Sequence, residues 1–252
     1  MANWSDPRTG LGNDTAPFGR TQPAVAAAGY DAGLRSYMLS VYNYMASGVL
    51  LSGIVAMVFA SSGYMQILFN PLTGKPSPLG WIVSLAPLAI VFAMSFGQQR
   101  MATGTLKGLF WAFAVLMGLS LSTIFVAYTG TSIAGAFFAT AAGFAGLSLW
   151  GYTTERDLSP MGTFLLVGLI GLLVASLLAI WLPGLNMVVS IVGVLIFAGL
   201  TAYDTQRIKS QYDYVAGTPQ VDRVVVMSAL NLYLDFINMF MFVLRLFGSS
   251  RN

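Results

Sequence analysis

The chain has 252 residues, of which 56% are hydrophobic and 8% carry a charged side chain. Soluble domains carry roughly 25% charged residues, so this composition excludes an ordinary soluble domain and indicates an integral membrane protein. The absence of cysteine and histidine excludes disulfides, thiolate centres, serine–histidine triads and histidine-based zinc sites. The net charge of +3 is small, and we attribute it to loops on one side of a membrane rather than to nucleic-acid binding.

The first part of the chain, residues 1–33, is polar, with proline, glycine, aspartate and arginine scattered through it. Such a segment lacks the apolar residues needed for a packed core, so we predict a mobile tail. It has no apolar stretch behind a basic start, which argues against a secretory signal peptide. The sequence therefore divides into a tail, 1–33, and a membrane domain, 34–252.

Apolar stretches of the length of a membrane span follow one another through the membrane domain. A helix needs about 20 apolar residues to cross a bilayer, and seven stretches reach or approach that length. Very short loops join the third to the fourth and the fifth to the sixth, which predicts antiparallel hairpins. The expected architecture is an all-α bundle of seven transmembrane helices. The predicted spans are 39–60, 79–96, 109–128, 131–150, 161–182, 187–203 and 224–247.

Small residues four positions apart recur within these spans. This spacing lets helix backbones approach closely in lipid, which predicts tight packing within one bundle. Pro87 lies inside the second span, where its missing amide hydrogen is expected to kink the helix. The small pairs are Gly48 with Ser52, Gly118 with Ser122, and Ala142 with Gly146.

Lysine and arginine are distributed unevenly between the two sides of the predicted bundle. Cytoplasmic loops are enriched in these residues. We therefore place the N-terminus in the cytoplasm and, because the number of spans is odd, the C-terminus outside. The nine on the cytoplasmic side are Arg8, Arg20, Arg35, Arg100, Lys107, Arg156, Arg207, Lys209 and Arg223; the three on the other are Lys75, Arg245 and Arg251.

Two acidic residues fall within or at the edge of a span: Asp204 in the sixth and Asp235 in the seventh. A charged aspartate at the bilayer centre costs at least about 2.5–3.5 kcal/mol on insertion scales, so it must be neutral, paired or in contact with water. Asn231, Asp235 and Asn238 recur at i, i+4 and i+7 and line one helical stripe. Such a stripe faces other helices, so we predict that the last helix is central in the bundle.

The depths of the two carboxyls decide whether they meet. Asp235 follows Arg223 by twelve residues, which places it about 15 Å into the membrane, whereas Asp204 lies near the cytoplasmic mouth. The depths match better if the last helix begins near Val221 or if the sixth continues beyond Lys209. Two carboxylates that meet in a low-dielectric site share one proton and titrate as a unit.

Loss of that shared proton is expected to create repulsion between the sixth and seventh helices and to open a path. Ca²⁺ favours carboxylate and carbonyl oxygens, so it would compete with protons for the same place. The alternatives are structural. Asp204 beside Arg207 would form an interfacial ion pair, and Asp235 would be a neutral carboxyl bonded to a neighbouring helix. Asn231 and Asn238 would join helices by hydrogen bonds, and Tyr203 and Tyr233 would be packing or interface aromatics.

Two stretches, GLTAYDTQRIK at 199–209 and ALNLYLDFINMF at 229–240, resemble the paired signature of the Bax inhibitor family. All seven spans follow the order of that family, and the resemblance suggests a bacterial member in the inner membrane. It implies a bundle whose last helix is surrounded by the other six. It also implies a pH-sensitive Ca²⁺ leak with a di-aspartyl sensor, which maps onto Asp204 and Asp235, without a resident cofactor other than Ca²⁺ itself.

The second span departs from the pattern of some members of the family. Those members carry an acidic residue within this helix and a basic cluster at its cytoplasmic end. Here the helix contains Pro87 and no acid, and it is followed by QQR at 98–100. Arg100, Arg207 and Lys209 are the candidates for a basic partner of the aspartates, and ordinary flanking charges are the alternative.

Two other functions remain open from the sequence. The family includes bacterial proteins that modulate a membrane-bound AAA protease, and residues 1–33 would serve as a handle for such a partner. An intramembrane aspartyl protease is the second, because Tyr203-Asp204 matches the YD of that class. Its other motif should read G-x-G-D, whereas Asp235 here follows Leu-Tyr-Leu, so we expect no enzymatic activity.

Overall fold

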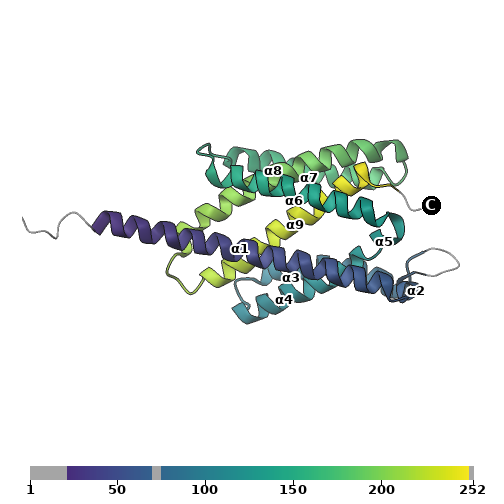
Figure 1. Ribbon diagram of the computed structural model, residues 1–252, viewed down its shortest axis with the longest axis horizontal. Coiled ribbons are helices and arrows are strands. Elements are labelled where there is room, and N and C mark those ends of the chain that lie inside the picture. Colours follow the sequence, from purple (N-terminus) through teal and green to yellow (C-terminus); the bar gives the residue numbers. More distant parts are fainter. Residues whose placement is uncertain (1–21, 70–74, 250–252) are drawn as a thin grey trace, which may run out of the picture.

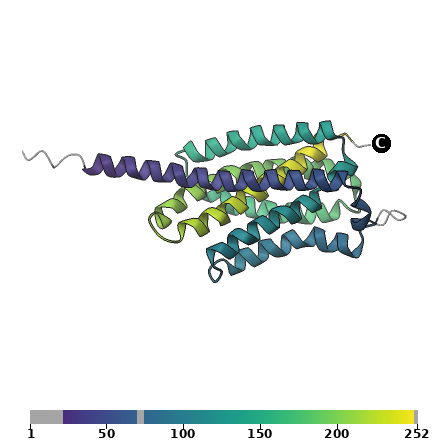
Figure 2. The ribbon, with the colours of Figure 1, turned by 60° about the horizontal axis from the view of Figure 1, so that its bottom comes forward.

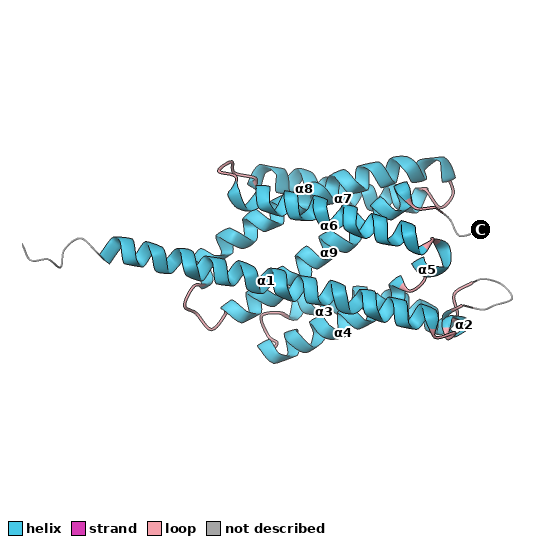
Figure 3. Ribbon diagram, viewed as in Figure 1, coloured by secondary structure: helices cyan, strands magenta, loops and turns pink. Residues whose placement is uncertain are grey.

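The structure is a computed structural model, and it describes residues 22–69 and 75–249. In this part of the chain the regular elements are helices (Figure 3), and seven are long and apolar enough to span a membrane. The predicted all-α membrane protein with seven spans is confirmed. The elements are α1 (Gln22–Ser61), α2 (Met65–Leu68), α3 (Pro78–Gly97), α4 (Thr103–Leu121), α5 (Ile124–Ala127), α6 (Gly130–Thr153), α7 (Ser159–Leu178), η1 (Pro183–Leu185), α8 (Asn186–Val215) and α9 (Val221–Phe247).

Each predicted span overlaps one of the seven long segments, but the ends differ. Residues 22–33 of the predicted tail belong to α1, because this stretch is rich in alanine, a strong helix former. The rest of that tail, 1–21, lies outside the described residues. The third predicted span is divided between α4 and α5, and α7 ends at Leu178, ahead of the turn that precedes Pro183.

Local sequence explains several helix boundaries. The Ser77 side chain accepts a hydrogen bond from the Gly80 backbone N–H at 3.0 Å, with Pro78 in the first position of α3. Pro87 is accommodated inside α3, which continues to Gly97. The turn from α8 to α9 contains Gly217 with a φ of 73°, a left-handed conformation that glycine adopts without strain.

Helix α9 is the centre of the bundle (Figures 1 and 2). In its most apolar stretch 67% of the residues are buried, against 11% in α7. It packs on α1, α4, α6 and α8, while α3 packs mainly on the outside of α4 and α7 on the outside of α8. The prediction of a central last helix is confirmed, but four helices, rather than all six, supply most of its packing.

One end of the bundle, which we call the basic end, holds the start of α1, the end of α8 and the start of α9. Polar contacts tie the start of α9 to α4 and to the turn between α3 and α4. Lys107 Nζ lies 2.7 Å from Asp222 Oδ2, and Arg223 donates to the Met101 carbonyl at 3.0 Å. The chain leaves α9 at the opposite end (Figure 1). The basic residues here are Arg35, Arg100, Lys107, Arg156, Arg207, Lys209 and Arg223.

Two of the predicted small-residue pairs lie at one helix interface. Gly48 and Ser52 of α1 and Gly118 of α4 are buried where these helices cross. A Cβ on Gly118 would lie 2.7 Å from the Ser52 carbonyl oxygen, closer than atoms pack. Gly146 of α6, in contrast, has no atom within 4 Å of such a Cβ. Close backbone approach therefore explains the first two pairs and not the third.

Candidate functional site: an acid pair between α8 and α9

Asp235 lies in the middle of α9. It is 5% exposed, and its Oδ2 atom has no hydrogen-bond partner. Leaving a buried acceptor unsatisfied costs about 1–3 kcal/mol, and more when it is charged. Buried polar groups in proteins are nearly always hydrogen-bonded, so an exception of this kind calls for a functional explanation.

Asp204 lies on α8, the helix that makes the most extensive contact with α9. It is half-buried, and its charge interacts with that of Asp235. Asp204 precedes Val215, the end of α8, by eleven residues, and Asp235 follows Val221, the start of α9, by fourteen. At 1.5 Å per residue their depths differ by only about 5 Å. The fold has both features that make the two depths similar: α8 continues beyond Lys209, and α9 begins at Val221.

The two asparagines of the stripe lie beside the acid pair in different ways. Asn238 is half-buried, and its Nδ2 donates to the Leu234 carbonyl at 2.8 Å, within its own helix. It also lines a cavity of about 460 Å³ between α3, α4 and α9. Asn231 is half-buried one turn before Asp235. The side-chain hydrogen bond of Asn238 therefore stays within α9 and does not join two helices, and the residue borders the cavity.

Of the three predicted basic partners, Arg207 is the one whose charge acts on Asp204. Its guanidinium interacts with Asp204, one turn earlier on α8. Arg207 also lines a pocket of about 340 Å³ at the basic end, together with Glu155 and Asp157. Arg100 is exposed in the turn between α3 and α4. Lys209 instead donates to the Tyr152 carbonyl at 2.9 Å.

Asp157, in the loop between α6 and α7, is an exposed, hydrogen-bonded carboxylate and contrasts with the buried Asp235. It is exposed, and the Ser159 backbone N–H donates to its Oδ1 at 2.9 Å. Hydrogen bonds from the hydroxyl and the backbone N–H of Ser159 hold the pKa of Asp157 below its usual value. This carboxylate is therefore ionised at neutral pH.

A hydrogen-bonded clamp that the sequence does not predict joins three helices near the site. Ser52 Oγ of α1 donates to the Ala114 carbonyl of α4 at 2.6 Å and lies 2.6 Å from Tyr233 Oη of α9. The sequence predicts Ser52 to be a small packing residue and Tyr233 to be a packing or interface aromatic. A hydroxyl in an apolar span needs a hydrogen-bond partner. This requirement is the one feature of the sequence that points to such a bond at Ser52 and Tyr233.

Two side chains of α8 hold the neighbouring loop and helix close to Asp204. Gln206 accepts from the Leu158 backbone N–H at 2.8 Å and donates to the Arg156 carbonyl at 2.8 Å. Thr205 Oγ1 lies 3.5 Å from Tyr42 Oη and 3.4 Å from Ser148 Oγ. The segment that carries Asp204 is therefore anchored to α1, α6 and the loop after α6.

Comparison with known proteins identifies the family. The sequence profile of the family described as "Inhibitor of apoptosis-promoting Bax1" matches residues 34–252. The chain belongs to the Bax inhibitor family.

Bacterial relatives share this sequence over nearly their whole length. An uncharacterised protein of Rickettsia prowazekii is 44% identical over 229 residues, which cover 88% of this chain and 93% of the relative. A protein of Caulobacter vibrioides is 42% identical over 243 residues, covering 93% and 97%. The inner membrane protein YbhL of Escherichia coli is 43% identical over 225 residues, covering 87% and 94%.

The family match includes all seven long segments, so the chain is an integral membrane protein of the Bax inhibitor family. Both signature stretches of the family fall inside helices, 199–209 in α8 and 229–240 in α9. Among the described residues, no group of three or more acidic, cysteine or histidine side chains gathers in one place. The acid pair therefore offers a cation two carboxyl groups at most.

Proposed function

We propose that this member of the Bax inhibitor family is a pH-sensitive, Ca²⁺-permeable leak channel gated by Asp204 and Asp235. One observation carries the proposal: Asp235 is buried on α9 with one carboxyl oxygen that has no hydrogen bond, and a second acid, Asp204, lies on α8, the helix that α9 contacts most extensively. Intramembrane acids mark ion and proton pathways more often than they serve packing. The proposal assigns no catalytic residue and no resident cofactor.

Gating would follow from the number of protons on the pair. With one shared proton, a single negative charge remains and α8 stays packed on α9. Loss of that proton leaves two like charges in a low-dielectric site, where their repulsion is strong. Arg207 is the positive charge that acts on Asp204. Because Arg207 lies on the same helix as Asp204, one turn away, it offsets only part of the repulsion between the helices.

Ca²⁺ would pass the pair as the transported ion. Resident Ca²⁺ sites supply about six to eight oxygen ligands, and two carboxyl groups fall well short of that number. Weak binding suits a transported ion, because the ion must leave the acid pair again. The cavity beside Asn238 and the pocket beside Arg207 lie on opposite sides of the pair along the bundle. We propose that they form the two ends of the path.

Ca²⁺ flux into vesicles tests the proposal. The purified chain would be reconstituted into liposomes that enclose a Ca²⁺-sensitive dye, and flux would be recorded over a series of pH values. We expect Ca²⁺ flux through the wild type to vary with pH. The double variant Asp204→Asn/Asp235→Asn should lose this pH dependence. Asp222→Asn, which removes an exposed acid that lines neither the cavity beside Asn238 nor the pocket beside Arg207, should behave as the wild type. Equal, equally pH-dependent flux through all three proteins would refute gating by the pair.

The proposed location is the bacterial inner membrane, because an E. coli relative is named as an inner membrane protein. The proposed orientation has the basic end in the cytoplasm, in keeping with the excess of lysine and arginine there. Reporter domains fused to the C-terminus in intact bacteria test this orientation. A reporter active only outside the cytoplasm should be active, and one active only in the cytoplasm should be silent.

A further inference from the structure

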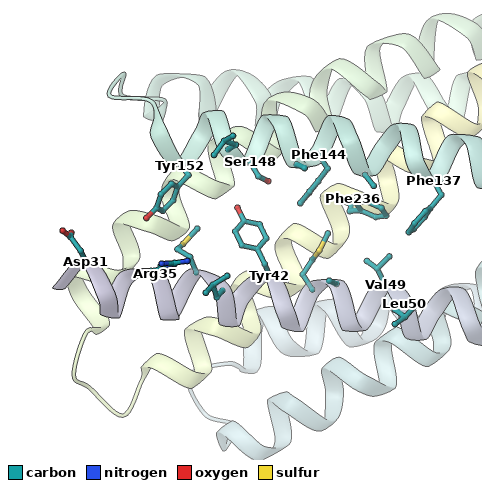
Figure 4. A pocket seen from close by; sticks show the side chains of 17 residues that line it. Asp31, Arg35, Tyr42, Val49, Leu50, Phe137, Phe144, Ser148, Tyr152 and Phe236 are labelled. Atoms are coloured by element: carbon teal, nitrogen blue, oxygen red, sulfur yellow. The ribbon is translucent and has the colours of Figure 1, made fainter. Parts of the chain in front are cut away.

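A long groove opens between α1 and α6 on the surface of the bundle (Figure 4). Its volume is about 860 Å³. Helix α1 packs on α4 and α9, and α6 packs on α8 and α9, so the groove lies over α9 and has Phe236 in its floor. It runs from Asp31 and Arg35 at the basic end to Leu50 and Phe137 (Figure 4).

The position of the groove decides what fills it. Leu39, Leu50 and Leu149 on its rims are all more than half exposed, so the groove is open on the side that faces the hydrocarbon of a membrane. Its wall is almost entirely apolar along the length of α1 from Asp31 to Leu50, about 29 Å. Water has too few polar partners there to occupy it. We therefore expect the hydrocarbon chains of lipid, rather than water, to fill the groove.

The shape of the groove suits an acyl chain better than a further helix. The groove holds about 860 Å³ and is lined by side chains of different sizes, whereas a helix is a rigid rod about 10 Å across. A flexible acyl chain is narrower and follows a bent wall. One leaflet accounts for about half of a hydrocarbon core of about 30 Å, so a chain that enters at the basic end reaches well along the groove.

The mouth of the groove at the basic end is positively charged. Arg35 lines it and is exposed. Lys209 lies beside it, with Nζ 4.9 Å from the centre of the Tyr152 ring and donating to the Tyr152 carbonyl at 2.9 Å. Asp31 also lines the mouth, but in the part of the chain that the structure describes the one ion pair within 4.0 Å is that of Lys107 and Asp222. Arg35 is therefore available to an external anion.

We propose that the groove between α1 and α6 is a binding site for an anionic phospholipid, with an acyl chain along the apolar wall and the phosphate against Arg35. Arginine binds phosphate through paired, charge-assisted hydrogen bonds. An anionic headgroup adds attraction to the two cations at the mouth that a zwitterionic headgroup lacks. This inference concerns lipid recognition and does not depend on the proposed channel function.

Photo-crosslinking with lipid probes tests the site without any measurement of ion flux. The full-length chain would be placed in phosphatidylcholine nanodiscs with a trace of phosphatidylglycerol that carries a diazirine in one acyl chain. Illumination, digestion and mass spectrometry then locate the label. We expect it on the groove faces of α1 and α6. We expect about fivefold less label from a matched phosphatidylcholine probe, as one basic side chain near the lipid surface would account for.

Matched variants separate the headgroup contact from the apolar groove. Arg35→Gln should reduce the preference for phosphatidylglycerol, while Arg156→Gln, at the same end but outside the groove, should keep it. Ala145→Phe, which narrows the groove, should lower labelling by both probes. Ala139→Phe, on the opposite face of α6 and exposed, should leave it unchanged. Equal labelling by the two probes in the wild type, label spread evenly over all lipid-facing helices, or a protein–protein cross-link through the groove would each overturn the proposal.

Discussion

Tyr233 and Asp235 lie two residues apart on α9 and therefore point to opposite sides of the same helix. Both are buried, and both carry a polar group inside the membrane. Tyr233 Oη lies 2.6 Å from Ser52 Oγ, and Ser52 is bonded in turn to α4. Asp235 Oδ2 has no partner. The Tyr233 side of α9 is therefore hydrogen-bonded to its neighbours. The Asp235 side carries an unsatisfied group that can change its charge.

The comparison shows how a central helix can be both fixed and switchable. A satisfied hydroxyl has one protonation state at ordinary pH and holds α9 against α1 and α4 at all times. An unsatisfied carboxyl beside a second carboxyl changes the force between α9 and α8 when it gains or loses a proton. Variants on the two sides should therefore have different effects: loss of stability on one side and loss of pH response on the other.

The largest effect is expected on the acid side. Asp235→Asn should abolish most of the pH dependence of Ca²⁺ flux in liposomes, because asparagine is neutral at every pH. In the wild type, flux should rise from mildly acidic to mildly alkaline pH as the pair loses its proton. Tyr233→Phe, the control from the other side, should keep the full response. A wild-type flux that falls as pH rises would contradict repulsion and indicate that Asp204 paired with Arg207 closes the channel.

The next largest effect is expected where α1 crosses α4. Gly118→Ala would place a Cβ 2.7 Å from the Ser52 carbonyl oxygen and 3.0 Å from Ser52 Cα, and overpacking of this kind costs about 1–3 kcal/mol. Unfolding in mixed micelles by a denaturing detergent measures this loss. The control is Gly146→Ala, which meets open space and should not lower stability, since alanine is the better helix former.

Smaller changes are expected within the clamp itself. Tyr233→Phe leaves Ser52 bonded to the Ala114 carbonyl, so the free energy of unfolding should fall by only about 0.5–1.5 kcal/mol. Ser52→Ala should cost more, because it leaves the buried Tyr233 hydroxyl without its partner. The double variant should lose less than the sum of the two. Additive losses would contradict a hydrogen bond between these side chains.

The smallest effect is expected at the basic end. The ion pair of Lys107 with Asp222 is partly exposed, with side-chain exposures of 35% and 64%. A double-mutant cycle with Lys107→Ala and Asp222→Ala should give a coupling energy of about 0.2–1 kcal/mol. Added salt should reduce it. A coupling that is large and insensitive to salt would show that this contact matters more to the bundle than its exposure implies.

Hydropathy and one helical stripe were sufficient to predict most of the fold. The spans follow from runs of apolar residues, and the central position of α9 follows from a stripe of Asn231, Asp235 and Asn238 that lipid would not tolerate. The same stripe led to Asp235 as a site residue. Asp204 was found because a second acid stands near the end of the preceding span. These inferences need only residue types and their spacing along one helix.

Features that depend on which helices are neighbours could not be predicted from the sequence. The clamp requires that Ser52, Ala114 and Tyr233 meet, although they are far apart in the chain and one partner is a backbone carbonyl. The groove between α1 and α6 arises because both helices pack on α9. Helix ends were also uncertain, because alanine-rich and polar segments continue a helix beyond the apolar run, as in α1 and α8.

The central helix of this bundle is also the last of its seven long segments to be synthesised. Six spans leave the ribosome before Val221, and the segment around which α1, α4, α6 and α8 pack follows them. Until it arrives, the inward faces of those helices meet lipid or one another. A chain that lacks α9 would therefore enter the membrane with the interior of the bundle exposed, so packing of the seven long helices is completed only when α9 arrives.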